Sequence, residues 1–219
     1  MKFNDLCRSK LMKKGGPGYA QPDDNTFPLL DDVIKMILDC QAIPMATWLD
    51  GTSTGEEKIL DLLECQMEKG VAAINIVPDR NWNIKDPDEQ KLKTKLFHEC
   101  ITAAQKLKLP VNVGTELNKF GQRWVDDFAA KAMAVVGKPM ISGAQIMVGH
   151  TRLLRFADFS YISEKAKSEF SDMNQRNDFF ESVGKLDCPK LSVIERMLTT
   201  DIETNFAYIS DSAKNGQWF

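Results

Sequence analysis

The chain has 219 residues, 43% of them apolar, so it can bury a sizeable core and is not expected to be disordered. Its formal net charge of −3 comes from interspersed acids and bases, which argues against a nucleic-acid-binding surface. The five cysteines are widely spaced and form no C-x-x-C pair, so they predict neither a disulfide framework nor a zinc site.

Targeting and membrane segments are also not expected. The amino-terminal residues carry charges and no apolar run follows them, which is unlike a secretory signal peptide. No stretch approaches the roughly 18 uninterrupted apolar residues that a membrane span needs. We therefore expect a cytoplasmic protein with reduced thiols and no membrane partner.

The first elements follow an irregular segment over residues 1–30, which is polar and contains Gly-Pro breakers. From Asp31 onward, apolar residues recur at helical spacing, so we expect a helix that begins with two carboxylates. The short apolar run over 42–48 predicts a buried strand, and a loop beginning at Asp50 follows it.

The same order of strand, loop and helix then continues along the chain. We expect amphipathic helices over 56–69 and 89–107, and strands over 71–77 and 110–115. The strands are continuously apolar, which is typical of a parallel sheet buried on both faces by helical crossovers. A barrel and an open doubly wound sheet both satisfy this pattern.

The second half of the chain is less regular. A third helix is expected over 124–135, with Asp126 and Asp127 in its first turn, where they would complement the helix dipole. A weaker fourth strand is expected over 140–148. From about residue 151 the pattern indicates helical pieces and loops. We assign 31–156 to the α/β domain and 157–219 to its helical carboxyl-terminal extension.

Polar residues gather in the loops that follow the three expected strands. These loops contain Asp50-Gly51-Thr52, then Asp79-Arg80-Asn81, then Glu116-Leu117-Asn118. Because the carboxyl ends of parallel strands meet at one edge of a sheet, the loops should converge there. A carboxylate, an arginine and several amides at one place suit a divalent metal or a polar, anionic substrate.

Glu116 stands directly after an apolar strand, where a carboxylate without a partner would cost desolvation free energy. A metal ion or a cationic group would stabilise it, and a half-solvated, salt-bridged acid is the alternative. His150 follows the expected fourth strand and is a candidate metal ligand or acid–base group, or else a structural histidine. Asp50 is a candidate catalytic carboxylate, although Asp50-Gly51 is also a common turn sequence.

The segment from Pro110 to Asn118 resembles the G-T-E-x-N strand end of PHP-domain proteins, within the metal-dependent hydrolase superfamily. The order I-P-x-R-N, here around Arg80, and the G-H-T at His150 are also similar to that group. The similarity extends over about residues 42–156.

The resemblance implies a partial (β/α) barrel and divalent metals, Mn, Zn or Mg, with Glu116 and His150 as ligands. It implies phosphoester hydrolysis, with metal-activated water and a small phosphorylated or sugar-like substrate contacting Asp79, Arg80, Asn81 and Asn118. The family's amino-terminal H-x-H motif and its D-x-H motif are not found. We therefore expect a fragment that lacks the amino-terminal half of a barrel or a chain that has lost its metals.

Two other functions fit the same residues. One is a non-catalytic module that binds a sugar or phosphate without a metal, and the other is a metal-dependent sugar isomerase or lyase. Three or four parallel strands cannot close a barrel, so exposed sheet edges should favour homo-oligomers.

Overall fold

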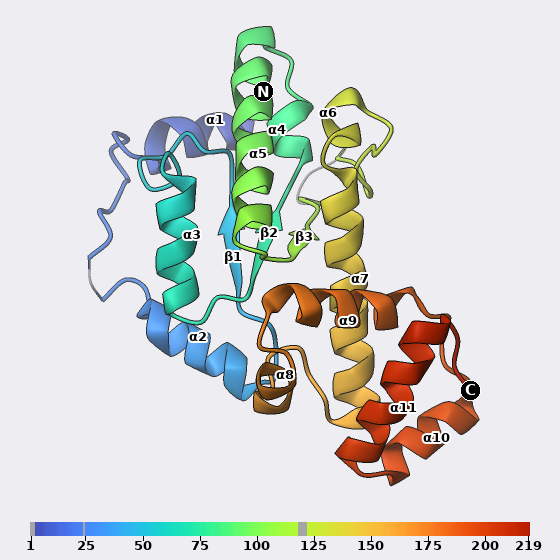
Figure 1. Cartoon of the computed structure of the whole chain (residues 1–219). Coiled ribbons are helices and arrows are strands. Elements are labelled where there is room, and N and C mark those ends of the chain that lie inside the picture. Colours follow the sequence, from blue (N-terminus) through green and yellow to red (C-terminus); the bar gives the residue numbers. More distant parts are fainter. Residues whose placement is uncertain (1–2, 24, 118–121) are drawn as a thin grey trace.

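The computed structural model describes residues 3–23, 25–117 and 122–219. It is a mixed α/β protein, mostly helical, with a small open parallel sheet (Figure 1). The strands are β1 (Met45–Trp48), β2 (Ala73–Ile76) and β3 (Val111–Val113), and they lie in the order β1-β2-β3. The strands expected over 42–48, 71–77 and 110–115 and their parallel pairing are thus confirmed.

Helices precede, connect and follow the strands. They are α1 (Phe3–Cys7), the π-helix η1 (Arg8–Met12), α2 (Leu30–Asp39), α3 (Ile59–Glu68), α4 (Asp79–Trp82), α5 (Pro87–Lys106), α6 (Lys131–Ala134), α7 (Gly137–Ala157), α8 (Glu164–Glu169), α9 (Met173–Lys185), α10 (Leu191–Thr199) and α11 (Ile202–Asn215). Across the described parts of the chain, none of these helices combines the length and apolar character needed to cross a membrane.

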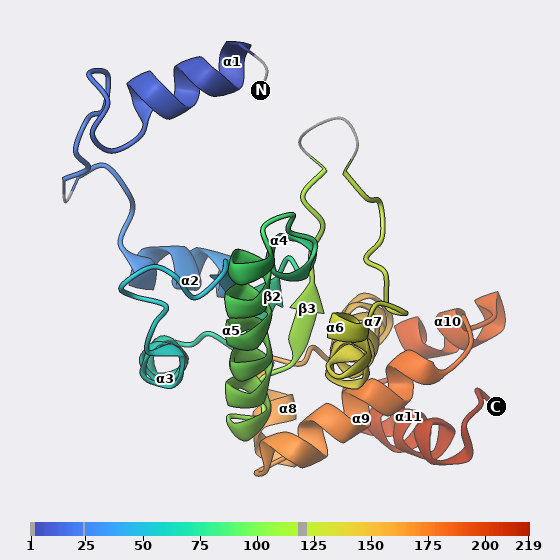
Figure 2. The same cartoon turned by 90° about the horizontal axis from the view of Figure 1, so that it is seen from above.

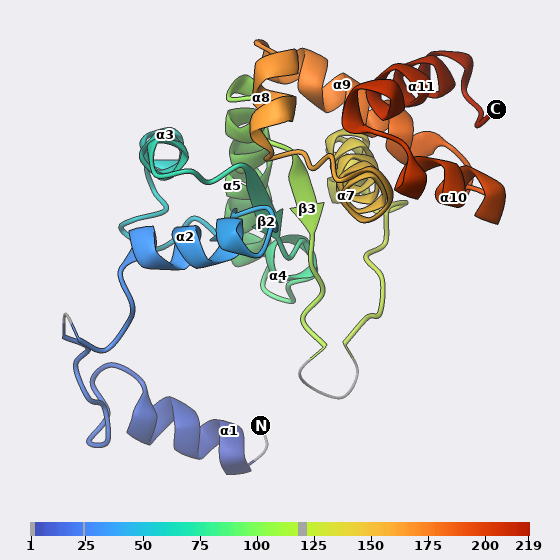
Figure 3. The ribbon, with the colours of Figure 1, turned by 90° about the horizontal axis from the view of Figure 1, so that it is seen from below.

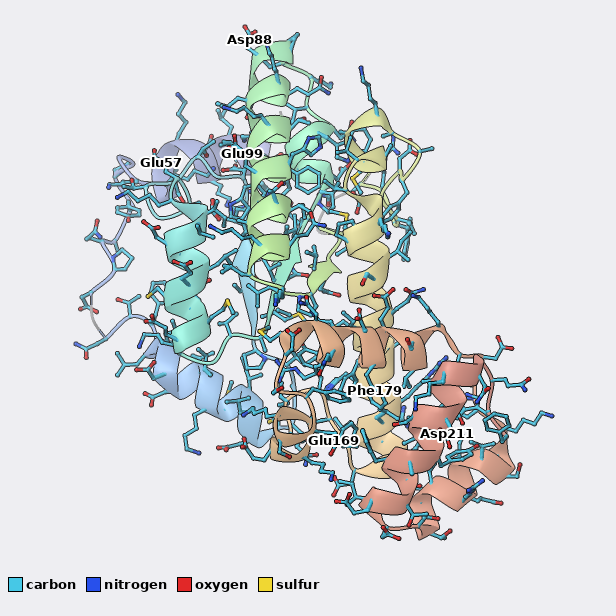
Figure 4. The ribbon with its side chains drawn as sticks, viewed as in Figure 1. Glu57, Asp88, Glu99, Glu169, Phe179 and Asp211 are labelled. Carbon is cyan, nitrogen blue, oxygen red and sulfur yellow. The ribbon has the colours of Figure 1, made fainter. Side chains whose placement is uncertain are left out.

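One face of the sheet is buried by α3 and α5. Ile74 and Ile76 of β2 point into this layer and pack in one apolar cluster with Phe97 of α5 and Leu63 of α3. Figure 2 shows α5 running along this face. The side chain of Asp86 caps the amino end of α5 by accepting the backbone N–H groups of Asp88 and Glu89. Asp88, in the first turn of α5, lies at the periphery (Figure 4). This layer matches the expected helical crossovers.

The expected strand over 140–148 is wrong, because these residues lie in the first half of α7. Buried residues recur along α7 at spacings of three and four, as at Met140, Gly143 and Ile146, and this periodicity continues through Leu153. The apolar run was too short to show its period without the residues that follow it. Helix α7 lies alongside β3 at the edge of the sheet where a further strand was expected (Figures 1 and 2).

Close backbone contacts hold α7 in place. A Cβ atom added at Gly143 would overlap the carbonyl oxygen of Val111 in β3. Further along α7, a Cβ at Gly149 would overlap the carbonyl of Phe180 in α9, and one at Gly184 of α9 would overlap the carbonyl of Gln145. Glycine therefore lets α7 approach both β3 and α9 at backbone distance.

The carboxyl-terminal helices build a second apolar cluster beneath the amino ends of the strands. Phe159 stacks on Phe180 with ring centroids 5.7 Å apart, and Phe179 meets Phe206 at 5.5 Å. Phe179 is labelled in Figure 4. Ala73 of β2 belongs to the same cluster, so this group of helices supports the sheet at the end opposite the polar loops.

Three shorter segments also differ from expectation. The loop after β2 forms the one-turn helix α4, and the helix expected over 124–135 is reduced to α6. Residues 3–12 of the amino-terminal segment are helical, although none of their side chains is buried. In each case a single turn or an unpacked helix lacks the long periodic pattern that identifies helices in a sequence.

Candidate functional site

Two of the three polar loops meet at the carboxyl end of the sheet. Arg80 lies on α4, directly after β2, and Glu116 follows β3. Nη1 of Arg80 donates to Oε1 of Glu116 at 2.7 Å, and both side chains are 36% exposed. The partner that stabilises the carboxylate at the strand end is therefore a guanidinium group, and the pair also fits the alternative of a half-solvated, salt-bridged acid.

A cleft of about 330 Å³ opens around this ion pair. Its polar walls come from α4 and from the segments that follow β3, and the residues that line it are Val77, Asp79, Arg80, Asn83, Ile84, Thr115, Glu116, Gln122, Arg123 and Asp126. The volume is at the lower end of the range for small-molecule sites. The cleft combines guanidinium donors with carboxylate and amide acceptors.

Arg123 forms the second cationic group of the cleft. Its guanidinium lies 5.5 Å from the centroid of the Trp82 ring, and its Nη1 is 3.5 Å from a carboxylate oxygen of Asp127. Stacking on an aromatic ring holds the planar guanidinium in one orientation. Since a guanidinium carries five N–H donors, Arg80 and Arg123 each retain donors beyond their ion pairs for a ligand.

Asp126 is the most buried carboxylate of the cleft, with only 7% of its surface exposed. Its Oδ1 has no hydrogen-bond partner among the described residues. Burial raises the pKa of this carboxyl above its usual range, and the nearby charge of Asp79 acts in the same direction. The carboxyl group has a hydrogen bond with the backbone of Asp79, and Oδ1 keeps unused acceptor capacity for a hydroxyl group.

This raised pKa predicts a pH-dependent loss of stability. An acid whose pKa is higher in the folded than in the unfolded state stabilises the fold less as pH rises above its unfolded value, near 3.8. We expect Asp126→Asn to raise the melting temperature at pH 7, and the difference to shrink as the pH is lowered towards 4. Thermal unfolding followed by circular dichroism between pH 4 and 8 measures this. A variant that is less stable than the wild type at pH 7 would contradict the assignment.

The loop after β1 does not join the cleft. The side chain of Glu56 accepts the backbone N–H groups of Leu49 at 2.7 Å and Gly51 at 3.1 Å, which closes this loop on itself. Lys93 pairs with Asp50 at 3.1 Å. Partial burial raises the pKa of Asp50, but hydrogen bonds from Thr52 and the pairing with Lys93 outweigh burial and lower it. The structure thus gives Asp50, a predicted catalytic residue, a structural environment.

Asn81 was predicted to bind substrate but lies fully buried beneath the cleft. Its Nδ2 donates to the backbone carbonyls of Leu49 at 3.0 Å and Val77 at 3.2 Å. These two carbonyls follow β1 and β2, so Asn81 ties the ends of neighbouring strands together. Its neighbours Asp79 and Arg80 do line the cleft.

His150 lies away from Glu116, and its expected position after a strand is wrong. It is on α7, whose beginning is near the carboxyl end of β3: Met140 and Thr115 line one hollow. His150 is ten residues further along, roughly 15 Å down the helix axis. There its Nδ1 accepts the backbone N–H of Tyr161 at 3.2 Å, and burial lowers the pKa of its imidazole. A structural role fits this position.

The two predicted metal ligands do not lie together. Glu116 is paired with Arg80, and His150, the other predicted ligand, does not line the cleft. Over residues 3–23, 25–117 and 122–219, no group of three or more histidine, cysteine, aspartate or glutamate side chains is arranged to hold an ion. Asn118, predicted to contact substrate, lies outside the described residues.

Arg123 and Asp126 were missed as site residues. Asp126 was expected at a helix start, and its position beside Asp79 depends on the irregular path between β3 and α6, which no sequence pattern specifies. In the sequence, the adjacent carboxylates of Asp126 and Asp127 are the feature that could have drawn attention to Asp126. Comparison with protein-family models, curated proteins and solved structures gives no match, so the cleft's own chemistry carries the functional argument.

Proposed function

We propose that the chain binds a small phosphorylated sugar in the cleft between α4 and the segments that follow β3. The observation that carries this proposal is the placement of two guanidinium groups, Arg80 and Arg123, in one cleft with the buried acceptor Asp126. Guanidinium groups recognise phosphate oxygens through paired N–H donors. Carboxylates accept hydrogen bonds from sugar hydroxyls. The ligand thus needs an anionic end and a hydroxylated end.

The charges of the cleft are compatible with an anion. Glu116 is neutralised by its ion pair with Arg80, and the raised pKa of Asp126 lowers the free energy needed to keep that carboxyl protonated. Asp79 accepts a hydrogen bond from Asn83 at 2.9 Å. A phosphate that approaches Arg80 can also compete with Glu116 for its guanidinium, so the ion pair acts as a preformed but exchangeable contact.

A PHP-type phosphoester hydrolase is the second candidate. The observation in its favour is the position of Glu116 at the end of β3, in the G-T-E-x-N pattern, beside Asp79 and Asp126 in the same cleft. The same binding site would then present a phosphoester for cleavage. Because the predicted metal ligands Glu116 and His150 lie apart, binding without turnover is our proposal for this chain.

We also propose that the sheet is part of a (β/α) barrel. The order β1, α3, β2, α5, β3 with parallel pairing is that of consecutive barrel units, and the two connecting helices, α3 and α5, lie on one face. The face opposite α5 would be the barrel interior. The position of the cleft at the carboxyl ends of the strands is where barrel proteins carry their sites.

Calorimetric titration with ribose 5-phosphate tests the binding proposal. We expect a saturable interaction that weakens at least tenfold in Arg80→Gln, since a charge-assisted hydrogen bond contributes about 1.5–3 kcal/mol. Arg155→Gln is the matched control, because Arg155 lies near the far end of α7, and it should bind as the wild type does. Equal affinities in both variants and the wild type would contradict the proposal. Release of inorganic phosphate on addition of Mn²⁺ would instead favour the hydrolase.

A further inference from the structure

The face of the sheet opposite α5 carries a row of polar side chains. Thr47 of β1 is opposite Asn75 of β2, and Asn75 is opposite Asn112 of β3. Side chains alternate between the two faces of a strand, so this row points away from Ile74 and Ile76, which pack on α5. A continuous polar row in the centre of a small sheet is unusual, since central strands are normally apolar on both faces when both are covered.

The two asparagines are linked and still have unused hydrogen-bonding groups. Nδ2 of Asn112 donates to Oδ1 of Asn75 at 2.8 Å. Within the described residues, no hydrogen bond involves Nδ2 of Asn75 or Oδ1 of Asn112, which leaves one donor and one acceptor side by side. The linking bond fixes the orientation of both amides. Such a pair matches a hydroxyl group, which donates and accepts at once.

No described helix covers this part of the sheet. The amino end of the same face is covered, because Met45 and Ala73 pack into the carboxyl-terminal cluster. Seen from above and from below, α1 and the amino-terminal segment lie apart from the sheet (Figures 2 and 3). Thr47 is exposed, and Asn75 and Asn112 are half-buried. A ligand can therefore reach the row from the open side of the sheet.

The row leads into the cleft. Val77 and Thr115 line the cleft, and they stand two and three residues beyond Asn75 and Asn112, roughly 7–10 Å along the strands. Gly114 stands between Asn112 and Thr115 in the chain, and a Cβ added there would come within 3.1 Å of Oδ1 of Asn75. Because Gly114 has no side chain, it leaves the path between the asparagines and the cleft clear. An extended five-carbon sugar phosphate can bridge this distance.

We propose that the Asn75–Asn112 pair, with Thr47, binds the hydroxyl groups of the sugar whose phosphate lies between Arg80 and Arg123. This inference rests on the proposed function and names the class of its ligand: an extended phosphorylated polyol or open-chain sugar, not phosphate alone. The phosphate contacts supply charge, and the asparagine row selects hydroxylated chains.

Calorimetric titrations with ribose 5-phosphate and with inorganic phosphate separate the two claims. In the wild type we expect ribose 5-phosphate to bind at least tenfold more tightly than inorganic phosphate. Asn75→Leu should remove most of this difference and leave the affinity for inorganic phosphate unchanged. Thr47→Val, at an exposed position that tolerates substitution, should reduce the difference severalfold. Thr102→Val on α5 is the control and should not change it.

The outcomes are distinct. If the wild type binds both ligands equally, or if Asn75→Leu and Thr47→Val remain folded and keep the full preference for ribose 5-phosphate, the inference fails and the cleft proposal stands. If the wild type binds neither ligand, the proposed function fails and the inference fails with it. If Asn75→Leu does not fold, Thr47→Val decides the question.

Discussion

Substitution of Gly143 by alanine is expected to destabilise the protein by about 3 kcal/mol. The added methyl group would overlap the backbone carbonyl of Val111, and a backbone atom inside a sheet cannot rotate away as a side chain can. Overpacking of a core costs about 1–3 kcal/mol and sometimes more. The higher helix propensity of alanine, about 1 kcal/mol, offsets only part of this cost. Urea unfolding followed by circular dichroism gives the value.

Gly55→Ala is the matched control for this substitution. An added Cβ there meets no atom within 4 Å, and we expect a change of at most about 1 kcal/mol, towards higher stability. Gly184→Ala should behave like Gly143→Ala, because its methyl group would overlap the carbonyl of Gln145. If Gly143→Ala is as stable as Gly55→Ala, α7 does not pack on β3 at backbone distance, and the placement of a helix at this edge is wrong.

The second large effect is expected at Asn81. Replacement by alanine removes two part-buried hydrogen bonds and leaves the carbonyl of Leu49 without this donor, while the carbonyl of Val77 still accepts the backbone N–H of Arg80. Each lost bond costs roughly 1 kcal/mol and the unpaired, part-buried carbonyl of Leu49 adds to this, so we expect a loss of about 2–3 kcal/mol. Differential scanning calorimetry should show a clear fall in melting temperature.

Asn215→Ala serves as the comparison, since Asn215 is exposed and donates one bond to Asp211 at 2.7 Å. Its effect should stay within about 0.5 kcal/mol. A folded Asn81→Ala variant should keep its affinity for ribose 5-phosphate at low temperature. If stability is unchanged while ligand binding is lost, Asn81 contacts the ligand directly, as its sequence position first indicated.

The parallel sheet could be predicted because its strands are short apolar runs joined by strongly periodic helices. The same reasoning placed Arg80 and Glu116 together, since topology alone brings the ends of β2 and β3 to one edge. It failed for His150, because the apolar run before it has the length of a strand and only its continuation to Ala157 reveals a helix. Because this one segment is a helix and not a strand, His150 lies on α7, away from the carboxyl end of the sheet where it was expected.

The site roles of Arg123 and Asp126 were not predicted for one physical reason. Arg123 and Asp126 stand in a segment without periodic structure, where ring stacking on Trp82 and proximity to Asp79 determine their positions. Such contacts join residues distant in the chain and leave no local pattern. Asn81 is the opposite case. It was predicted to contact the ligand, but its buried side chain donates to the backbone carbonyls of Leu49 and Val77.

Guanidinium resonances give the most direct test of the central claim, which is that a phosphorylated sugar binds between Arg80 and Arg123. In ¹⁵N-edited spectra of the whole chain, titration with ribose 5-phosphate should shift the side-chain Nε–H signals of these two residues along one saturable curve. The signal of Arg155, near the far end of α7, should stay in place. If the Arg80 and Arg123 signals do not move while the ligand is in large excess, the cleft does not bind it.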